Sequence, residues 1–228
     1  MKVSRIQAAE NRERILDVAT MLFRERGIDG IGVADLMKAA GLTHGGFYGH
    51  FKSKEDLVAQ ACARAVKRMR HNWTGIIDQA PGDPLEALAA VYLTPRHRDN
   101  VGKGCTMAAL GSEIARQGPS VRRAFTDELK PFLDYLSRIV QGSSSRLRRK
   151  RALAAYASLV GALIVSRAVD DPKLSDEILS AAAATMHDSV VEQGANGILP
   201  SHRVTPAAKR RSTKHASGTR KIRSTIPQ

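Results

Sequence analysis

Cysteine and aromatic residues are scarce in this sequence. Two of its 228 residues are cysteines, and phenylalanine, tryptophan and tyrosine together make up 4%. Cys62 and Cys105 lie far apart and form no CxxC or cysteine–histidine spacing, which argues against a zinc site and against a disulfide framework. So few aromatics, with abundant alanine and leucine, favour packed helices over sheets. We therefore expect an all-α fold, no metal site and a reducing compartment.

A secretion signal and a long apolar run are also missing. The first residues, MKVSRIQAAENRER, have no apolar centre of the kind that an export signal needs. The most apolar stretch runs from Ala152 to Ser166 between two arginines, and it is shorter than the roughly 20 residues of a membrane span. We therefore expect a buried helix here, no membrane partner and a cytoplasmic protein.

Acidic residues are outnumbered by basic ones, and the net charge is +14. Excess cations are attracted to phosphate polymers. Residues 1–60 are almost balanced, however, whereas residues 193–228 hold basic residues and no acidic one. Their polar composition without apolar periodicity predicts a disordered basic tail. Two interpretations of this tail stay open: added nonspecific DNA affinity through counterion release, or simple solubilisation.

Apolar residues recur at helical spacing along most of the chain, and no alternating strand pattern competes with them. The tight breaks are rich in glycine and proline. Helices are predicted at about 8–26, 33–40, 43–50, 54 to the low seventies, 84–92, 105–116, 120–141, 146–169 and 174–191, with a loop at 94–104. The predicted organisation is an N-terminal arm (1–8), a DNA-binding domain (9–58), a helical body (59–192) and the tail (193–228).

Residues 9–58 contain the order of elements that defines a helix-turn-helix unit. A long helix and a short helix are followed by a turn at Gly41-Leu42 and by a second short helix. In such a unit the second short helix enters the major groove, where each base pair displays a distinguishable pattern of donors and acceptors. The order of elements therefore predicts a DNA-binding domain.

The string GLTHGGFYGHFKSKEDL, from Gly41 to Leu57, resembles the signature of the TetR family of bacterial transcriptional regulators. The preceding AAENRERILDVATMLFRERGIDG resembles it too, whereas the body matches only in being helical and of suitable length. The resemblance implies a three-helix DNA-binding head on a larger ligand-binding and dimerisation body. It implies a regulator and not an enzyme, with no cofactor.

The resemblance also implies a set of DNA-contacting residues. Tyr48 and Lys54 match phosphate-binding positions of the family, and Thr43 caps the recognition helix, where its hydroxyl or amide could bond a phosphate. Each also has an ordinary structural interpretation as a cap, a turn residue or a solvated surface residue. The predicted DNA-binding residues are Thr43, His44, Gly45, Gly46, Tyr48, His50 and Lys54.

Three positions depart from the family pattern. His44 stands where the family often has lysine, which weakens the Coulombic attraction at that point. Gly46 stands where threonine, serine or alanine is common, which reduces direct readout by a side chain. Gly32-Val33 occupies the place of a phosphate-binding hydroxyl, so only the amides remain there.

Family members bind as twofold dimers, because one three-helix head reads too few base pairs for useful discrimination. The apolar faces of the last two predicted helices are the expected dimer surface, with the intrachain core as the alternative for any one residue. The predicted interface residues are Leu153, Tyr156, Leu159, Val160, Leu163, Ile164, Ile178, Leu179, Ala182 and Met186.

The resemblance implies, finally, a small-molecule inducer that releases the homodimer from a double-stranded DNA operator. Such a ligand must bind the arrangement that is not competent for DNA more tightly than the competent one. An aromatic and methionine stripe at helical spacing is more often core than pocket. The candidate ligand-binding residues are Trp73, Met107, Phe125, Phe132 and Tyr135.

Two other functions are alternatives to a ligand-released repressor. Cys105 follows Lys103-Gly104 at a predicted helix start, where the helix dipole and a neighbouring cation could make the thiol reactive; redox or electrophile sensing is one alternative, and a small buried residue is the plainer interpretation. Nonspecific, charge-driven nucleic-acid binding is the other. An enzyme is disfavoured, because the sequence has no glycine-rich phosphate loop, no metal-ligand spacing and no nucleophile with a base.

Overall fold

The computed structural model describes residues 4–195, and the side chains of those up to residue 186. These residues are helical with no strand among them, which confirms the all-α prediction. The elements are α1 (Arg5–Arg26), α2 (Val33–Ala39), the 3₁₀ helix η1 (His44–Gly49), α3 (Lys54–Asp78), α4 (Pro84–Tyr92), α5 (Pro95–Asp99), the 3₁₀ helix η2 (Val101–Lys103), α6 (Thr106–Ile114), α7 (Pro119–Ile139), α8 (Ser145–Ala168) and α9 (Pro172–Ala195).

Local sequence determines where these helices begin. Proline is the first residue of α4, α5, α7 and α9, a position at which its missing N–H leaves no helical hydrogen bond unmade. Polar caps precede several helices: Ser53 Oγ accepts a hydrogen bond from the Asp56 amide at 3.1 Å, and Asp83 Oδ1 accepts one from the Leu85 amide at 2.8 Å. These starts follow from short-range chemistry, which is why the sequence predicts most of them.

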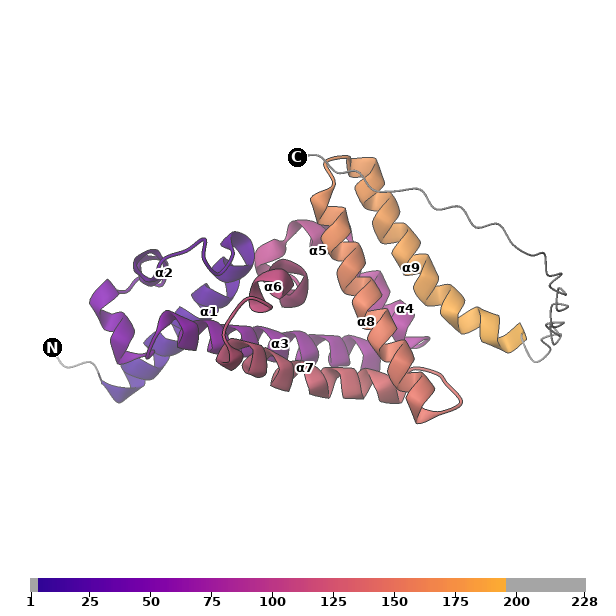
Figure 1. The fold of residues 1–228 in the computed structure, drawn as a ribbon, viewed down its shortest axis with the longest axis horizontal. Coiled ribbons are helices and arrows are strands. Elements are labelled where there is room, and N and C mark those ends of the chain that lie inside the picture. Colours follow the sequence, from indigo (N-terminus) through magenta and orange to yellow (C-terminus); the bar gives the residue numbers. More distant parts are fainter. Residues whose placement is uncertain (1–3, 196–228) are drawn as a thin grey trace, which may run out of the picture.

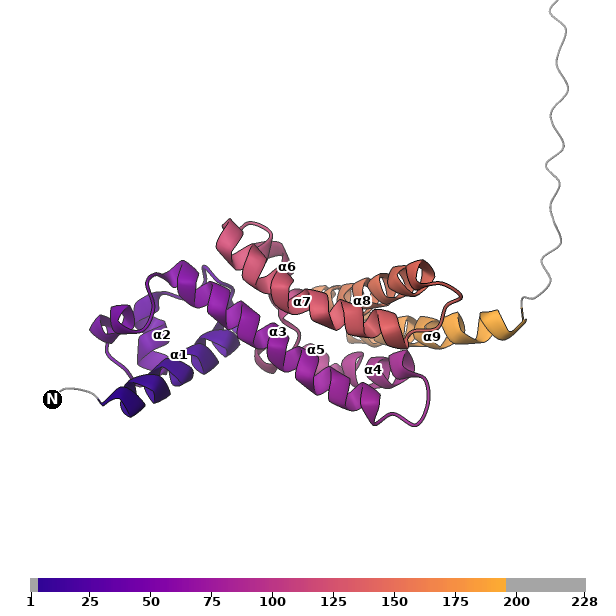
Figure 2. The same cartoon turned by 90° about the horizontal axis from the view of Figure 1, so that it is seen from below.

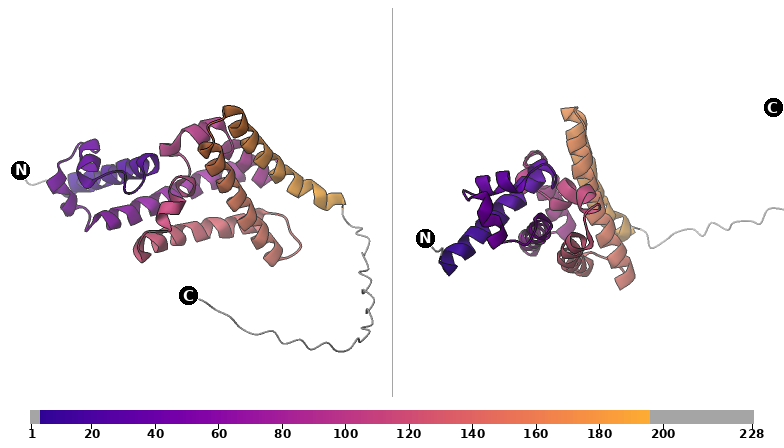
Figure 3. Two further views of the ribbon diagram at one scale, coloured as in Figure 1. Left: turned by 45° about the horizontal axis from the view of Figure 1, so that its top comes forward. Right: turned by 60° about the vertical axis from the view of Figure 1, so that its left-hand side comes forward.

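The helices form an elongated molecule with the N-terminal head at one end (Figure 1). The head consists of α1, α2, η1 and the beginning of α3. Helix α3 then leaves the head and packs along α7, as Figure 2 shows from below. Helices α8 and α9 lie side by side at the end away from α2 (Figure 3). One continuous helix, α3, therefore connects the head to the rest of the molecule.

Two hydrophobic clusters stabilise this arrangement. The first is centred on Phe23, Phe47 and Phe51 of the head, and it also includes Cys62 of α3 and Phe125 of α7. The second joins α3, α4, α7, α8 and α9 around buried aromatic side chains. The predicted boundary between residues 58 and 59 falls inside α3, so no linker separates head from body, and the division into two functional units stays a prediction.

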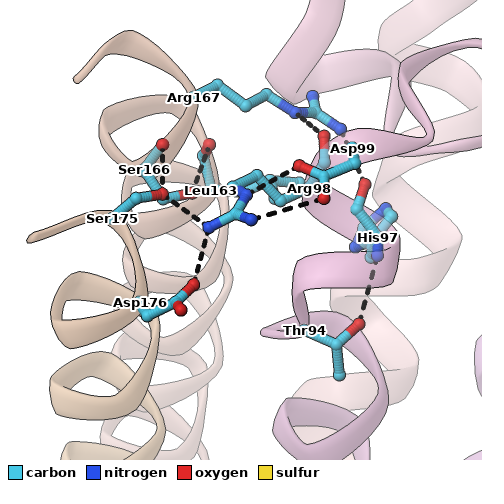
Figure 4. Close-up of polar contacts among 9 residues, drawn as sticks. All are labelled: Thr94, His97, Arg98, Asp99, Leu163, Ser166, Arg167, Ser175 and Asp176. Carbon is cyan, nitrogen blue, oxygen red and sulfur yellow. Dashed lines mark hydrogen bonds and ion pairs between the residues drawn. The ribbon is translucent and has the colours of Figure 1, made fainter. Parts of the chain in front are cut away.

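The segment from Thr94 to Gly104 is not the loop that the sequence predicts. It contains α5 and η2, because Thr94 caps the first turn, with Oγ1 accepting a hydrogen bond from the His97 amide at 3.2 Å, and Pro95 follows it. Arg98 of this segment donates to Ser175 and Asp176 of α9, each at 2.7 Å (Figure 4). Helices this short are stabilised by polar contacts to distant elements, which apolar periodicity does not reveal.

Several predicted bounds also change. Residues 5–8 belong to α1 and not to an arm. The second short helix of the predicted helix-turn-helix unit, which we call the recognition element, is the 3₁₀ helix η1. Helix α3 reaches Asp78. Helix α9 continues to Ala195, and the remainder of the predicted tail, 196–228, lies outside the described residues.

Helix α8 is longer than the apolar run that the sequence suggests. With 24 residues it is, by length and composition alone, the one helix in the described part of the chain that could cross a membrane. It packs against both α7 and α9, and Ala152, Leu159 and Leu163 are almost fully buried there. One face of α8 therefore packs into the core of the molecule, while other apolar residues of the helix stay exposed.

Candidate nucleic-acid interface

The turn between α2 and η1 has a well-defined hydrogen-bonded geometry. Gly41 has a φ of 70°, a backbone conformation that residues other than glycine rarely adopt. The Leu42 amide donates to the Met37 carbonyl at 2.9 Å, and the Gly41 amide donates to the Lys38 carbonyl at 3.0 Å. These two bonds form a Schellman motif, which ends α2 and fixes the direction in which the chain enters η1.

One side of the recognition element η1 packs into the core of the head and anchors it there. Phe47 is completely buried, and its ring stacks on that of Phe51 with 5.7 Å between centroids. The Gly46 amide donates to the Thr43 carbonyl at 3.1 Å, which closes the first turn after the Thr43 cap. The anchoring is thus apolar, and the other side of η1 is left to solvent.

The solvent side of η1 combines bare backbone with one large aromatic ring. A methyl group added at Gly45 or at Gly49 would meet no atom within 4 Å, so neither glycine is required by packing inside the chain. Tyr48 is 68% exposed and contacts Phe47 edge-on at 5.2 Å. An exposed aromatic side chain beside unobstructed backbone is a surface suited to close approach by a partner.

The beginning of α3 lies directly after this surface. Ser53 caps it, and Asp56 Oδ2 accepts a hydrogen bond from the Lys52 amide at 3.0 Å. Burial raises the pKa of Asp56, but hydrogen bonds from Gln60 and from the Lys52 amide outweigh it, and the pKa lies below its usual value. The amides of this first turn and the Lys54 side chain are positive groups at the start of a 25-residue helix, and the acidic Glu55 and Asp56 lie beside them.

Helix α1 supports α3 through polar contacts as well as the shared core. The Arg12 guanidinium lies 4.8 Å from the centroid of the Phe51 ring and donates to Gln60 Oε1. Arg64 of α3 pairs with Glu13 and Asp17 of α1. The recognition element and the helix after it are therefore held on one rigid support.

The seven predicted DNA-binding residues lie in η1, at its two ends, and at the start of α3. Thr43, His44, Gly45 and Tyr48 are exposed, whereas Gly46, His50 and Lys54 are half-buried. Gly49, which is not in the predicted set, is also exposed on this element.

The five candidate ligand-binding residues do not line one pocket. Phe132 is completely buried in the second core, whereas Phe125 belongs to the first. Tyr135 is half-buried and donates from its hydroxyl to Asp78, and Met107 packs against both cores. Trp73 is the member of the set that also lines a cavity, described below. Helical spacing identifies an apolar stripe, but it does not separate core packing from a pocket wall.

The predicted dimer surface needs a similar correction. Six of the ten residues are buried within the single chain, where a partner cannot reach them: Tyr156, Leu159, Val160, Leu163, Leu179 and Met186. Ile178 and Ala182 are half-buried. Leu153 and Ile164 are 41% and 43% exposed, and two apolar residues outside the predicted set, Val165 and Leu174, are 49% and 43% exposed. The stretch from Ala152 to Val165 of α8 is apolar on most sides, and only its packing on α7 and α9 decides which face stays open.

Cys105 is the N-cap of α6 and is only 2% exposed. Its amide donates to His97 Nε2 at 3.1 Å. This position agrees with the plainer interpretation of a small buried residue. Both cysteines are free thiols, and no group of three or more His, Cys, Asp or Glu side chains that could hold a metal occurs within the described part of the chain.

The fold and this surface define a class of protein: a helix-turn-helix head, stiffened by a Schellman turn, on an all-helical body. Residues 15–61 match the family of bacterial regulatory proteins of the tetR type. The N-terminal head of the chain is therefore a DNA-binding domain of the TetR type.

Named relatives are similar over part of the chain. The regulator AcrR of Shigella flexneri is 34% identical over 87 residues, which are 38% of this chain and 40% of that protein. The repressor KstR2 of Mycolicibacterium smegmatis is 32% identical over 38% of this chain and 42% of its own length. The chain thus matches about two fifths of the length of these relatives.

Solved structures resemble the whole described fold. E. coli NemR in its reduced form has a TM-score of 0.66 at 23% identity, with 78% of this chain and 96% of that chain covered. A TetR transcriptional regulator from Chloroflexus aurantiacus has a TM-score of 0.68 at 21% identity, with 81% and 96% covered. At this level of identity the likeness concerns the fold.

Proposed function

We propose that this protein is a sequence-specific DNA-binding transcriptional regulator that acts as a homodimeric repressor and is released from its operator by a small molecule. The observation that carries the proposal is the outer surface of η1. It presents Tyr48 and bare glycine backbone, and the sequence from Gly41 to Lys54 contains no acidic residue. A phosphate backbone can approach such a surface without electrostatic repulsion.

Each residue has a definite part in the proposed complex. Helix η1 enters the major groove, and His44 at its start faces base edges. The Tyr48 hydroxyl, the Thr43 cap and Lys54 bind phosphates on either side of the groove. The missing side chains of Gly45 and Gly49 allow the backbone itself to approach the DNA.

Dimerisation in the proposed complex uses the open face of α8 and α9. Leu153, Ile164, Val165 and Leu174 supply exposed apolar surface, and neighbouring alanines allow close helix approach. Two heads held about 34–36 Å apart reach successive turns of the major groove, which makes a twofold-symmetric operator the expected target.

The remaining features of the proposal follow the family. Several relatives are named repressors, which supports repression over activation. Residues 9–58 serve as the DNA-binding unit and residues 59–192 as the sensing and dimerisation unit. The protein works in the cytoplasm, where bacterial DNA is accessible, and it has no catalytic role.

The direct test is selection of genomic fragments by the purified full-length protein. We expect enrichment of a short, twofold-symmetric sequence over its scrambled version. Tyr48→Phe, which removes one phosphate bond, should weaken binding to every selected sequence by roughly tenfold. Thr126→Val, which removes an exposed hydroxyl from α7, is the matched control and should have no effect. Equal binding to all duplexes, with steep salt dependence, would instead support a charge-driven coating protein.

Thiol sensing through Cys105 remains a second candidate. Cys105 lines a small pocket together with Lys103 and Arg24, which gives an incoming reagent a cationic approach. Thiol labelling of the native protein distinguishes a reactive sensing cysteine from an inert buried one. A Cys105 that reacts faster than free cysteine would support sensing, and one that reacts no faster removes this candidate.

A further inference from the structure

Two adjoining pockets lie where α3 and α4 meet the α5–η2 segment. The larger has a volume of about 300 Å³ and the smaller about 190 Å³. They share four lining residues, Asn72, Trp73, His97 and Lys103, so they are neighbouring parts of one cavity system. Together they approach the size of ligand sites in other proteins.

The two parts differ in chemistry. The larger part has an apolar wall made of Trp73, Ile76, Leu88, Val91 and Tyr92, and Arg96 and Lys103 lie at its polar side. The smaller part is lined by Arg24, Arg68, Lys103 and the polar Asn72. No aspartate or glutamate lines either part. A cavity of this kind is complementary to a molecule with an apolar body and a negatively charged end.

Three of the four lining cations lack an acidic partner. Arg68 pairs with Asp17 at 3.1 Å, but Arg24, Arg96 and Lys103 take part in no ion pair within residues 4–186. Arg24 donates instead to the Gly102 carbonyl, through Nε at 2.8 Å and through Nη2. Burial lowers the pKa of Arg24, and the neighbouring Glu25 offsets only part of this effect.

His97, between the two parts, is already committed to backbone groups. Its Nδ1 lies 2.7 Å from the Tyr92 carbonyl, and its Nε2 accepts a hydrogen bond from the Cys105 amide. Nδ1 therefore carries the proton, and the neutral ring is consistent with the lowered pKa that burial gives His97. The positive charge available to a ligand comes from Arg24 and Lys103 in the smaller part, and from Arg96 in the larger one.

We propose that this cavity is the inducer site and that it takes an amphipathic organic anion, such as an aryl or alkyl carboxylate or sulfonate. The apolar body lies against Trp73 and the charged group lies between Arg24 and Lys103. This inference deepens the proposed function, on which its regulatory half rests, because Arg24 belongs to α1 of the DNA-binding head.

The cavity is connected through short contacts to the DNA-binding head and to the proposed dimer helices α8 and α9. An anion that binds Arg24 competes with the Gly102 carbonyl for the same guanidinium and so loosens η2 from α1. At the other end of the segment, Arg98 donates to Asp176 of α9, and Arg167 of α8 donates to the carbonyls of His97 and Arg98 at 3.0 and 2.9 Å (Figure 4). The segment that walls the cavity therefore contacts the head and the proposed dimer helices.

The chemical class is tested on the full-length protein with two fluorescent probes that differ in charge. 1-Anilinonaphthalene-8-sulfonate is anionic, and N-phenyl-1-naphthylamine is its uncharged counterpart. Trp73 is the single tryptophan and lines both parts of the cavity, so energy transfer from it is strongest for a probe bound there, and Lys103→Gln tests the location. We expect the anion to bind at least tenfold more tightly, and Lys103→Gln to reduce its affinity by about tenfold while leaving the neutral probe unchanged.

Lys67→Gln is the matched control, because Lys67 is exposed on α3 and lines neither part of the cavity. It should leave both affinities unchanged. Equal affinity for the two probes, or an unchanged anion affinity in Lys103→Gln, overturns the proposal.

The regulatory half is tested on the operator found by fragment selection. Saturating sulfonate probe should lower operator affinity at least fivefold in the wild-type protein and less in Arg24→Gln. Probe binding without any effect on operator affinity overturns the coupling alone. Absence of any preferred DNA sequence overturns the proposed function, while the probe titrations, made without DNA, still decide the ligand class.

Discussion

Two glycines in the recognition region have opposite physical roles. Gly41 is required by its own backbone conformation, whereas Gly45 has an open surface position that alanine could occupy. No contact or backbone conformation inside the molecule explains why position 45 is a glycine. The close approach of a partner to the backbone is the explanation that the proposed function supplies.

This contrast gives a paired prediction. Gly41→Ala should lower the free energy of unfolding by about 1–2 kcal/mol, because alanine is strained at positive φ. Gly45→Ala should raise it slightly, by up to about 1 kcal/mol, because the unfolded chain loses freedom, and yet it should weaken operator binding. Urea unfolding and fluorescence anisotropy with labelled DNA measure the two effects. Unchanged DNA affinity in Gly45→Ala would show that the backbone does not approach the duplex there.

At the scale of elements, the start of α3 depends on two side chains that cap it in different ways. Ser53 acts as a neutral acceptor for the Asp56 amide, while Asp56 acts as a charged acceptor for the Lys52 amide. The charged acceptor makes this turn dependent on pH, since the pKa of Asp56 is lower in the folded protein than the value of about 3.9 in an unfolded chain.

The direction of this dependence can be worked out. A carboxyl whose pKa falls on folding contributes stability above its unfolded pKa and loses that contribution as the pH falls through the folded value. Asp56→Asn should therefore lower the Tm at pH 7, and the difference from wild type should shrink below about pH 4. Ser53→Ala, with no charge change, should lower the Tm by a similar amount at pH 3 and at pH 7. Thermal unfolding between pH 3 and pH 7 checks both, and a constant Asp56→Asn difference would contradict the prediction.

The α5 segment illustrates an element that exists because of distant contacts. Arg167 of α8 satisfies two carbonyls of α5 that have few alternatives at the end of so short a helix. Arg167→Met should reduce the free energy of unfolding by about 1–3 kcal/mol, because those carbonyls lose their donor. Asp176→Asn, which weakens an exposed contact of the same segment, should have a smaller effect.

Urea unfolding followed by Trp73 fluorescence is suited to this comparison, since Trp73 contacts Tyr92, just before α5, with 4.9 Å between ring centroids. Equal effects of Arg167→Met and Asp176→Asn would indicate that the carbonyl contacts do not stabilise the segment.

At the scale of the whole molecule, the open apolar face of α8 must be covered if the protein is a dimer. Ile164→Asp places a charge on that face without disturbing the chain's own core, since Ile164 is 43% exposed. We expect a folded monomer with strongly reduced operator affinity, because two linked heads bind far more tightly than one. Sedimentation velocity gives the oligomeric state and circular dichroism the fold. Lys130→Asp, an exposed change on α7, should leave the dimer intact, and a dimeric Ile164→Asp would place the interface elsewhere.

The sequence alone determined the features that depend on short-range chemistry. The glycine at the turn, the serine, threonine and aspartate caps and the prolines at helix starts act on neighbouring backbone groups, so they predict the helices and the helix-turn-helix head. The resemblance of Gly41–Leu57 to a known family then supplied the set of residues proposed to contact DNA, from Thr43 to Lys54.

Tertiary structure decided the features that depend on which faces meet. Tyr156, Leu163 and Ile164 belong to the same apolar run of α8. Packing against α7 and α9 buries the first two and leaves the third exposed. Arg24 and Lys103 are 79 positions apart, and the fold alone brings them to one cavity. Periodicity describes one helix at a time, whereas a surface, a core or a pocket is a relation between helices.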